Sequence, residues 1–355
     1  MASCVRIPIR LRLEGNRGPM RLSSVRMPAR QLGLLLGVLL LPVALVSLWV
    51  GPISLSPVQL LQPGSRDWLV LFELRMPRLV MSLAAGAVLA MTGASIQALF
   101  RNPLADPGLI GISAGAALAA VAVLVFGGAW LLGPLGAVLV PLAAFVGGVL
   151  VTALVVRIAR TPQGVSVTTM LLAGIALNSI AAAGIGVMKY FSDELSLRQV
   201  TFWLLGNLHS TDWHSALLLV ACAIPVLWLL WREGQQLNLL LLGEAQARLL
   251  GVMTGRLRRR LVLLVALGVG TVVSLGGLIG FIGLVVPHLV RLLCGPDNRA
   301  LLPLSALLGA LLLTLADILA RVLVSPAELP IGIVTALIGG PFFLMMILYR
   351  QRGGL

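Results

Sequence analysis

The sequence contains little charge and almost no lysine. Only 11% of its 355 residues are charged and 59% are hydrophobic, whereas a water-soluble domain of this size needs more ionisable groups on its surface. The single lysine, Lys189, lies at the end of an apolar run, and a phosphate-binding loop needs a lysine directly after a glycine. These absences exclude a soluble globular domain, and they exclude ATP hydrolysis by this chain through such a loop.

Cysteines and aromatic residues are also scarce. The three cysteines, Cys4, Cys222 and Cys294, stand far apart, which indicates neither a disulfide framework nor a zinc site, so we expect no metal and no cofactor. The net charge of +14 could suit a nucleic acid, but the arginines lie in short segments between apolar runs and only 5% of the residues are aromatic. The placement of the arginines between apolar runs is explained better by membrane orientation than by binding of a nucleic acid, so no nucleic acid partner is expected.

The sequence has instead many apolar runs of membrane-spanning length. Eight runs have the roughly 17 to 25 residues that cross a bilayer as a helix. The stretch 261–294 is apolar for 34 residues; as one helix it would be about 51 Å long, against a hydrocarbon core of about 30 Å. We expect it to break near Gly276 and Gly277 and to cross twice, which gives ten spans. The eight clear runs are 31–50, 76–100, 108–128, 131–156, 167–190, 214–231, 301–320 and 331–350.

The distribution of basic residues predicts the orientation of these spans, because cytoplasmic loops carry the excess of arginine and lysine. With ten spans and both termini in the cytoplasm, 20 basic residues lie inside and six outside. The six outside are Arg66, Arg75, Arg78, Lys189, Arg198 and Arg321.

The second span carries small residues at a four-residue spacing. This pattern lets a helix pack closely against its neighbours inside a bundle. We therefore expect the second span to be central and these residues to serve packing. They are Ser82, Gly86, Ala90, Ala94 and Ala98.

Residues 1–30 contain seven arginines and precede the first span. They are interpreted as a cytoplasmic tail or as an over-long gene start, because no small-residue cleavage site follows the first apolar run. Residues 31–350 form the transmembrane domain, whose longest cytoplasmic connection is 232–260. Helix-forming residues around Glu244 predict a short helix there, either a docking helix for a soluble partner or an amphipathic connector on lipid headgroups.

Two patterns suggest other chemistry. Gly111–Gly115 matches the G-x-S-x-G motif of serine hydrolases, with Ser113 as nucleophile and His288 as its imagined base, but that motif requires a strand before the serine and here an apolar helix is expected. Asp317 stands four residues before Arg321, which favours an ion pair over a proton relay. An intramembrane serine protease and a proton-coupled carrier stay as alternatives.

Several long motifs resemble those of one family, the permeases of bacterial ABC importers for ferric siderophores, haem and cobalamin. The resemblance covers about 31–350, with the motifs in the family's order. They are Arg75-Met-Pro-Arg78, Gly93 with Gln97, Arg101-Asn-Pro-Leu-Ala-Asp-Pro-Gly108, Trp203-Leu-Leu-Gly206, Leu242-Gly-Glu-Ala-Gln-Ala-Arg-Leu-Leu-Gly251, Gly280-Phe-Ile-Gly-Leu-Val-Val-Pro-His288, Ala316-Asp-Ile-Leu-Ala-Arg321 and Glu328-Leu-Pro-Ile-Gly332.

The resemblance implies an all-α integral membrane protein of about ten transmembrane helices with the type II ABC importer permease architecture. It implies a homodimer in the bacterial inner membrane, with a translocation path along the dimer axis, two ATPase subunits beneath it and a periplasmic substrate-binding protein above it. The permease itself would be a transport subunit and not an enzyme. The implied cargo is an iron(III) chelate, either a siderophore or haem, with cobalamin as the alternative.

The resemblance also implies roles for individual residues. Asn102 and Leu104 match residues that narrow the cytoplasmic mouth, and the loop from Gly243 to Gly251 matches the surface that enters the ATPase cleft. The residues expected at the outer rim, where they would receive carboxylates of the binding protein, are Arg75, Arg78 and Arg321. The residues expected to couple the permease to the ATPase are Gly243, Glu244, Ala247, Arg248 and Gly251.

Overall fold

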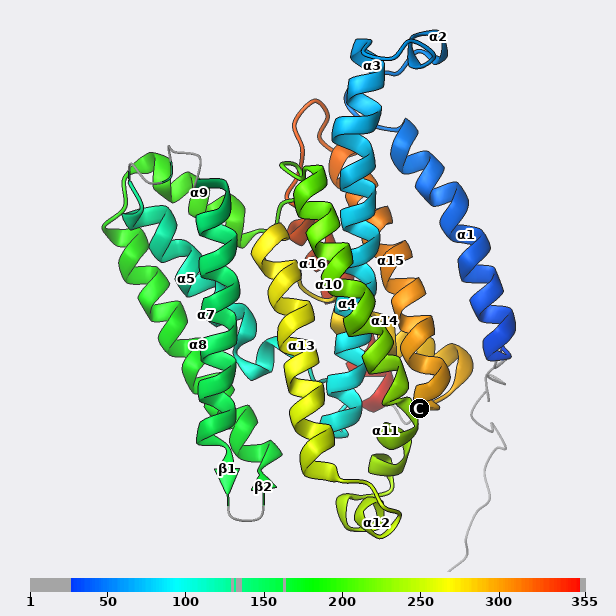
Figure 1. Cartoon of the computed structure of the whole chain (residues 1–355), viewed down its shortest axis with the longest axis vertical. Helices are drawn as coiled ribbons and strands as arrows, with labels where there is room; N and C mark the ends of the chain where they lie inside the picture. Colours follow the sequence, from blue (N-terminus) through cyan, green and yellow to red (C-terminus); the bar gives the residue numbers. More distant parts are fainter. Residues whose placement is uncertain (1–26, 129–130, 132–135, 162–163, 352–355) are drawn as a thin grey trace, which may run out of the picture.

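The protein is a bundle of long helices that run between two ends of the molecule (Figure 1). The computed structural model describes residues 27–128, 131, 136–161 and 164–351. Its first half comprises the helices α1 (Ala29–Trp49), α2 (Pro57–Leu60), α3 (Arg66–Leu69), the π-helix η1 (Val70–Arg75), α4 (Met76–Phe100), the 3-10 helix η2 (Pro107–Ile110), α5 (Ile112–Phe126), α7 (Gly136–Ile158) and α8 (Val167–Tyr190), and a two-stranded antiparallel pair, β1 (Arg160–Thr161) and β2 (Gly164–Val165).

Among its described residues, the second half contains helices joined by short turns and loops. Its helices are α9 (Glu194–Leu204), α10 (Trp213–Arg232), α11 (Gly234–Leu241), α12 (Glu244–Leu249), α13 (Thr254–Gly276), α14 (Ile282–Cys294), α15 (Asn298–Val322) and α16 (Ile331–Gln351).

The expected ten spans correspond to ten helices. Among the described residues, seven helices are long and apolar enough to cross a membrane, and α5, α14 and α16 are three further apolar helices. The start of α1 lies at the lower end of the bundle, where α11 and α12 also lie (Figure 1). Of the predicted tail, residues 1–26 lie outside the described part of the chain, and α1 begins at Ala29.

Helix α4 is the central element of the fold, as its small residues predicted. It is the most buried of the long apolar helices and packs against α15, α10, α14 and α13. Two glycines allow the closest approaches. A Cβ atom on Gly86 would overlap the carbonyl oxygen of Gly309 in α15, and one on Gly93 would overlap that of Gly283 in α14. The backbones of three helices therefore meet directly, which small residues permit inside membranes.

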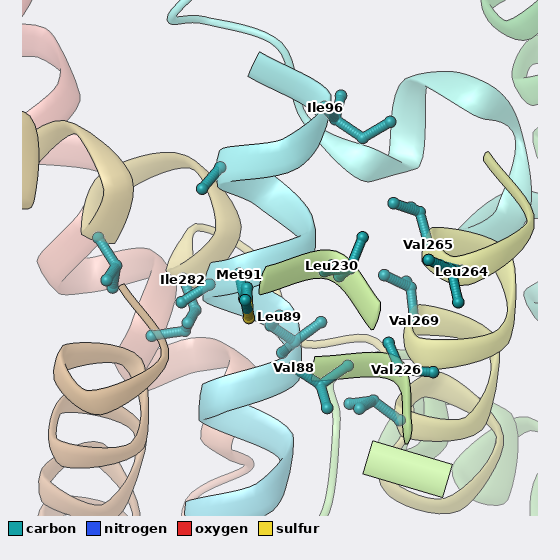
Figure 2. Packing of buried hydrophobic residues seen from close by; sticks show 14 of the residues in the cluster. Val88, Leu89, Met91, Ile96, Val226, Leu230, Leu264, Val265, Val269 and Ile282 are labelled. Carbon is teal, nitrogen blue, oxygen red and sulfur yellow. The ribbon is translucent and has the colours of Figure 1, made fainter. Parts of the chain in front are cut away.

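Hydrophobic side chains fill the space around α4. Figure 2 shows those of α4, α10 and α13 packed against one another, with Ile282 of α14 on the other side. A second group, α5, α7 and α8, packs together and joins the rest through contacts of α5 and α7 with α13. The labelled members of the core are Val88, Leu89, Met91, Ile96, Val226, Leu230, Leu264, Val265, Val269 and Ile282.

The apolar stretch 261–294 breaks where predicted. Helix α13 ends at Gly276, Gly277 has φ 71° and Phe281, the N-cap of α14, has φ 67°. The break packs against the end of α9, since a Cβ atom on Gly277 would overlap the carbonyl oxygen of Trp203. The amide of Asn207 donates to the carbonyl oxygen of Gly276 at 2.8 Å. A carbonyl group at the break therefore has a hydrogen-bond partner in a neighbouring segment, as non-helical backbone at membrane depth requires.

The second membrane helix is longer than the predicted 76–100. It is continuous from Arg66 to Phe100, 35 residues in all, and passes through the π-helix η1. The extra turns continue above Arg75 and Arg78, so both arginines lie inside the bundle and not at the mouth of a span. The expectation of a span that begins near 76 was wrong because the polar residues at the start of the helix have partners in other segments: Asp67 accepts from the amide of Ser56, and Arg75 donates to the carbonyl oxygens of Leu48 and Trp49. A hydropathy pattern does not register such partners.

We predict that Gly93→Ala destabilises the protein, because even a methyl group would collide with the backbone of Gly283. Overpacking of this kind typically costs about 1 to 3 kcal/mol. Gly37→Ala in α1 is the control, since no atom lies within 4 Å of the added carbon there. Thermal unfolding of the purified protein in detergent would measure both variants, and an equal melting temperature for the two would contradict the close contact.

Candidate functional site

An ion-pair cluster joins α4 to α15 near the upper end of the bundle. Asp317 is 0% exposed and accepts a hydrogen bond from Nε of Arg78 at 2.8 Å, while its second oxygen lies 3.1 Å from Nη2 of Arg321. Nη1 of Arg78 donates to Glu328 at 2.8 Å. The predicted pair between Asp317 and Arg321 is therefore present, and it is one edge of a larger network.

Arg75 and Arg321 bind the end of α1. Nη1 of Arg75 donates to the carbonyl oxygens of Leu48 and Trp49 at 2.8 and 2.7 Å. Nη1 of Arg321 donates to those of Ser47 and Val50 at 3.0 and 3.1 Å. The last carbonyls of a helix lack partners within the helix and carry a partial negative charge. The two guanidinium groups satisfy them and fasten α1 to the bundle.

The three arginines line a cavity and do not form an exposed rim. All three are buried, which corrects the expectation of free positive charge around the outer mouth. The cavity has a volume of about 600 Å³, and its lining includes Arg75, Arg78, Arg321, Glu328 and His209. The lining contains three guanidinium groups and the carboxylate of Glu328, so its net charge is positive. Asp317 is not part of the lining and pairs with Arg78 and Arg321.

Glu328 and His209 close one side of this cavity. Nδ1 of His209 lies 3.1 Å from the carboxylate of Glu328. Burial acts to raise the pKa of Glu328, but the charge and hydrogen bond of Arg78, together with His209, outweigh it and hold that pKa below its usual range. Glu328 is therefore ionised at neutral pH.

The chain after α4 makes a compact turn at the lower end. Arg101 has φ 49°, the amide of Asn102 donates to the oxygen of Gln97 at 3.1 Å, and the amide of Leu104 donates to the side chain of Asn102 at 3.0 Å. Asn102 is exposed and Leu104 half-buried. Asn102 and Leu104, the two residues predicted to narrow the cytoplasmic mouth, thus lie in one turn, and the hydrogen bond between them stabilises that turn.

Both ends of this turn are anchored to other helices. The side chain of Gln97 donates to the oxygen of Leu284 in α14 at 3.2 Å and accepts from Arg291 at 3.1 Å. At the other end, the amide side chain of Asn178 in α8 donates to the oxygen of Gly108 at 3.3 Å. A displacement of α14 or α8 would therefore reach Asn102 and Leu104 through hydrogen bonds.

The predicted cytoplasmic helix is present as a pair, α11 and α12. Glu244 opens α12 and accepts from Arg248 at 2.8 Å and from Arg258 of α13 at 3.3 Å. Burial acts to raise the pKa of Glu244, but the hydrogen bond from Arg248 and the charge of Arg258 outweigh it and keep the pKa below its usual range. The carboxylate therefore fixes α12 to the first turn of α13.

The tip formed by α12 exposes apolar residues to the lower side. Leu249 is 88% exposed and Leu242 is 61% exposed, and both lie outside the membrane-spanning helices. Gly243 and Gly251 bound the helix with φ 116° and 86°, conformations that glycine adopts without strain. Ala247 is fully buried, so it packs α12 in place and does not itself present a contact surface.

The arrangement favours neither alternative chemistry. Ser113 lies in the first turn of α5, directly after the 3-10 helix η2, and not after a strand as the hydrolase motif requires. Asp317, the candidate for a proton relay, is held between two arginines. Within the described residues, no group of three or more His, Cys, Asp or Glu is placed to hold a metal ion.

Comparison with known proteins decides the family. The profile of the FecCD transport family matches residues 38–349, which is most of the chain. The chain belongs to the FecCD transport family. This membership, together with the fold, makes it a multi-pass membrane permease of the bacterial ABC importer type.

Individual relatives agree over nearly their whole length. The hemin transport system permease protein HmuU of Yersinia pestis is 44% identical over 328 residues, which are 92% of this chain and 97% of the relative. The vitamin B12 import system permease protein BtuC of Vibrio vulnificus is 44% identical over 310 residues, 87% of this chain and 91% of the relative.

Solved structures agree with the fold. A structure described as an inward-facing conformation of a metal-chelate type ABC transporter matches with a TM-score of 0.81 and 33% identity, over 90% of this chain and 99% of that one. PsaBC from Streptococcus pneumoniae, in complex with Fab, matches with a TM-score of 0.54 and 20% identity, over 79% of this chain and 92% of that one; this second likeness concerns the fold alone.

Sequence reasoning missed three partnerships. Asp317 and Glu328 were not recognised as partners of Arg78, because they follow it by 239 and 250 residues in the chain. The hydrogen bond between Arg291 and Gln97 was missed for the same reason. A signal did exist, since a carboxylate or an arginine within a membrane span calls for a nearby partner.

We predict that Asp317→Asn strongly destabilises the protein, because it leaves Arg78 and Arg321 facing each other in a buried site. Removal of one partner from a buried ion pair costs about 3 to 5 kcal/mol. Glu73→Gln is the control, since Glu73 is exposed. Thermal unfolding in detergent would show the loss at both low and high salt, because salt screens buried charges poorly. Equal stability of the two variants would contradict the role of this carboxylate.

Proposed function

We propose that this chain is the pore-forming permease subunit of an ATP-driven, binding-protein-dependent importer of an iron(III) chelate. The observation that carries this proposal is the full-length likeness to HmuU, together with the apolar tip of α12 on the side expected to face the cytoplasm. Haem is the first candidate cargo and a ferric siderophore the second. Cobalamin is the alternative, because the likeness to BtuC is equally close.

The proposed assembly is a homodimer with two ATPase subunits beneath it, and both termini of each permease lie in the cytoplasm. The permease hydrolyses nothing itself. The lower end carries the start of α1 and the helices α11 and α12 (Figure 1), and it collects most of the basic residues of the described part of the chain, which supports its cytoplasmic assignment.

The tip of α12 is the proposed contact with the ATPase. Exposed apolar residues that gather at one place indicate an interaction site, and Leu242, Leu249 and Leu250 at the two ends of α12 are each more than half exposed. Glu244 and Arg248 brace this tip against α13, so that a push on α12 would move α13 with it. Gly243 and Gly251 provide the turns that let the helix project.

The turn that contains Asn102 and Leu104 is the proposed cytoplasmic gate. Its exposed position and its anchors to α14 and α8 support this role. The binding protein is proposed to dock above the outer cavity, where one of its carboxylates would enter and meet Arg75, Arg78 and Arg321. A change of these arginines to glutamate would break the internal cluster as well, so it does not test docking alone.

Uptake into vesicles tests the proposed function. Proteoliposomes would contain the permease with its ATPase, with ATP on the ATPase side and the binding protein on the other. We expect ATP-dependent accumulation of haem, and the same vesicles would be offered a ferric siderophore and cobalamin. Uptake of cobalamin alone would select the alternative cargo, and uptake driven by a proton gradient without ATP would contradict an ABC importer.

We predict that Leu249→Glu weakens assembly with the ATPase at least tenfold, about 1.4 kcal/mol, because it places a charge in an apolar contact. Its fold should be unaffected, since the side chain is 88% exposed. Leu61→Glu is the control, because Leu61 is 84% exposed near the opposite end. Copurification of the ATPase with each variant measures the effect, and equal recovery would remove α12 from the interface.

A further inference from the structure

One face of the protein combines a lipid-facing apolar surface with arginines at its lower end. Helix α13 is buried along most of its length and exposes one stripe in its first half, which includes Arg256, Arg260 and Leu263. These residues share a helix face because they are four and three positions apart. Leu263 is 62% exposed, so the stripe changes from charged to apolar within one turn.

The neighbouring helix α10 presents a matching stripe. Trp228 and Trp231, near its lower end, are about half exposed, and the guanidinium of Arg232 lies over the Trp228 ring, 4.8 Å from its centre. The helices α10 and α13 lie side by side (Figure 1) and are joined by a contact of 3.2 Å between Sγ of Cys222 and Oγ1 of Thr271. Exposed tryptophan beside arginine is typical of the level at which lipid headgroups begin.

A cavity of about 460 Å³ lies where these two stripes end. Its lining includes Arg232, Gln235, Leu239, Met253, Arg256 and Arg260. A carboxylate lies next to this lining, since Oε1 of Glu233 is 3.5 Å from Nη1 of Arg260. Three arginines against this carboxylate leave the cavity with an excess of two positive charges.

We propose that this cavity binds the headgroup of an anionic phospholipid of the inner leaflet, with its phosphodiester between Arg232, Arg256 and Arg260. Guanidinium groups match phosphate oxygens in charge and geometry, and basic pockets between membrane helices on the cytoplasmic side bind such headgroups. The acyl chains lie along the apolar stripes above. The lipid braces the junction of α10 and α11 against the junction of α12 and α13, directly above the tip that carries Leu249.

The position of the cavity favours a lipid over the ATPase as its occupant. Its arginines continue upward into the exposed Trp228, Trp231 and Leu263, and below them Leu250 and Gly251, which follow α12, complete its lining. An acidic segment of the ATPase would meet the same arginines but would not contact Trp228, Trp231 and Leu263, whereas an acyl chain would cover these exposed side chains.

Lipid binding to the full chain tests this site without any transport assay, so its failure is distinguishable from failure of the proposed function. The permease, alone and with its ATPase, would be placed in nanodiscs of phosphatidylcholine containing spin-labelled phosphatidylglycerol. We expect Arg256→Gln/Arg260→Gln to lower the preference for phosphatidylglycerol at least tenfold. Arg157→Gln/Arg160→Gln removes the same charge from the same side and should leave the preference unchanged.

Three results would overturn the proposal. An equal loss in both double variants would mean general attraction by surface charge. An unchanged lipid preference with loss of ATPase copurification in the Arg256 and Arg260 variant would assign the cavity to the ATPase. Competition by soluble glycerophosphoglycerol as strong as that by the intact lipid would show that the apolar stripes contribute nothing and that the site binds free phosphate esters.

Discussion

The direct backbone contact of α4 with α14 and α15 is the constraint on which the rest of the structure depends. Lipid gives helices no hydrophobic reason to associate, so close packing must supply the stability of the bundle. Gly93 and Gly86 allow that packing on two sides of one helix. Because α4 is fixed in this way, the turn at its lower end and the arginines near its upper end have defined positions.

The upper arginines show how the protein keeps charge inside a membrane bundle. Arg78 and Arg321 share Asp317, and Arg75 and Arg321 satisfy the free carbonyls of α1. Each charged group thus has a partner, as the high cost of unpaired charge in lipid demands. The same cluster lines a positive cavity, so a structural role and the proposed binding role are compatible at one place.

At the lower end, hydrogen bonds connect neighbouring helices. Gln97 and Arg291 tie the turn of Asn102 and Leu104, the proposed gate, to α14, while Glu244 ties α12 to α13. The helices α13 and α14 are separated only by the break at 277–281. A push on α12 therefore has a continuous route through packed helices to Asn102 and Leu104, and the proposed lipid would stiffen the first part of that route.

The membrane class, the ten helices, the break near Gly276 and the family could all be predicted from the amino-acid sequence, because hydropathy, glycine spacing and long motifs are local signals. So could the pair between Asp317 and Arg321, which lie one turn apart. The burial of Arg75 and Arg78, the pairing of Glu328 with Arg78 and the hydrogen bond of Arg291 to Gln97 became visible in the folded structure alone. These contacts join segments far apart in the chain, and their geometry exists only once α4 has packed against α14 and α15.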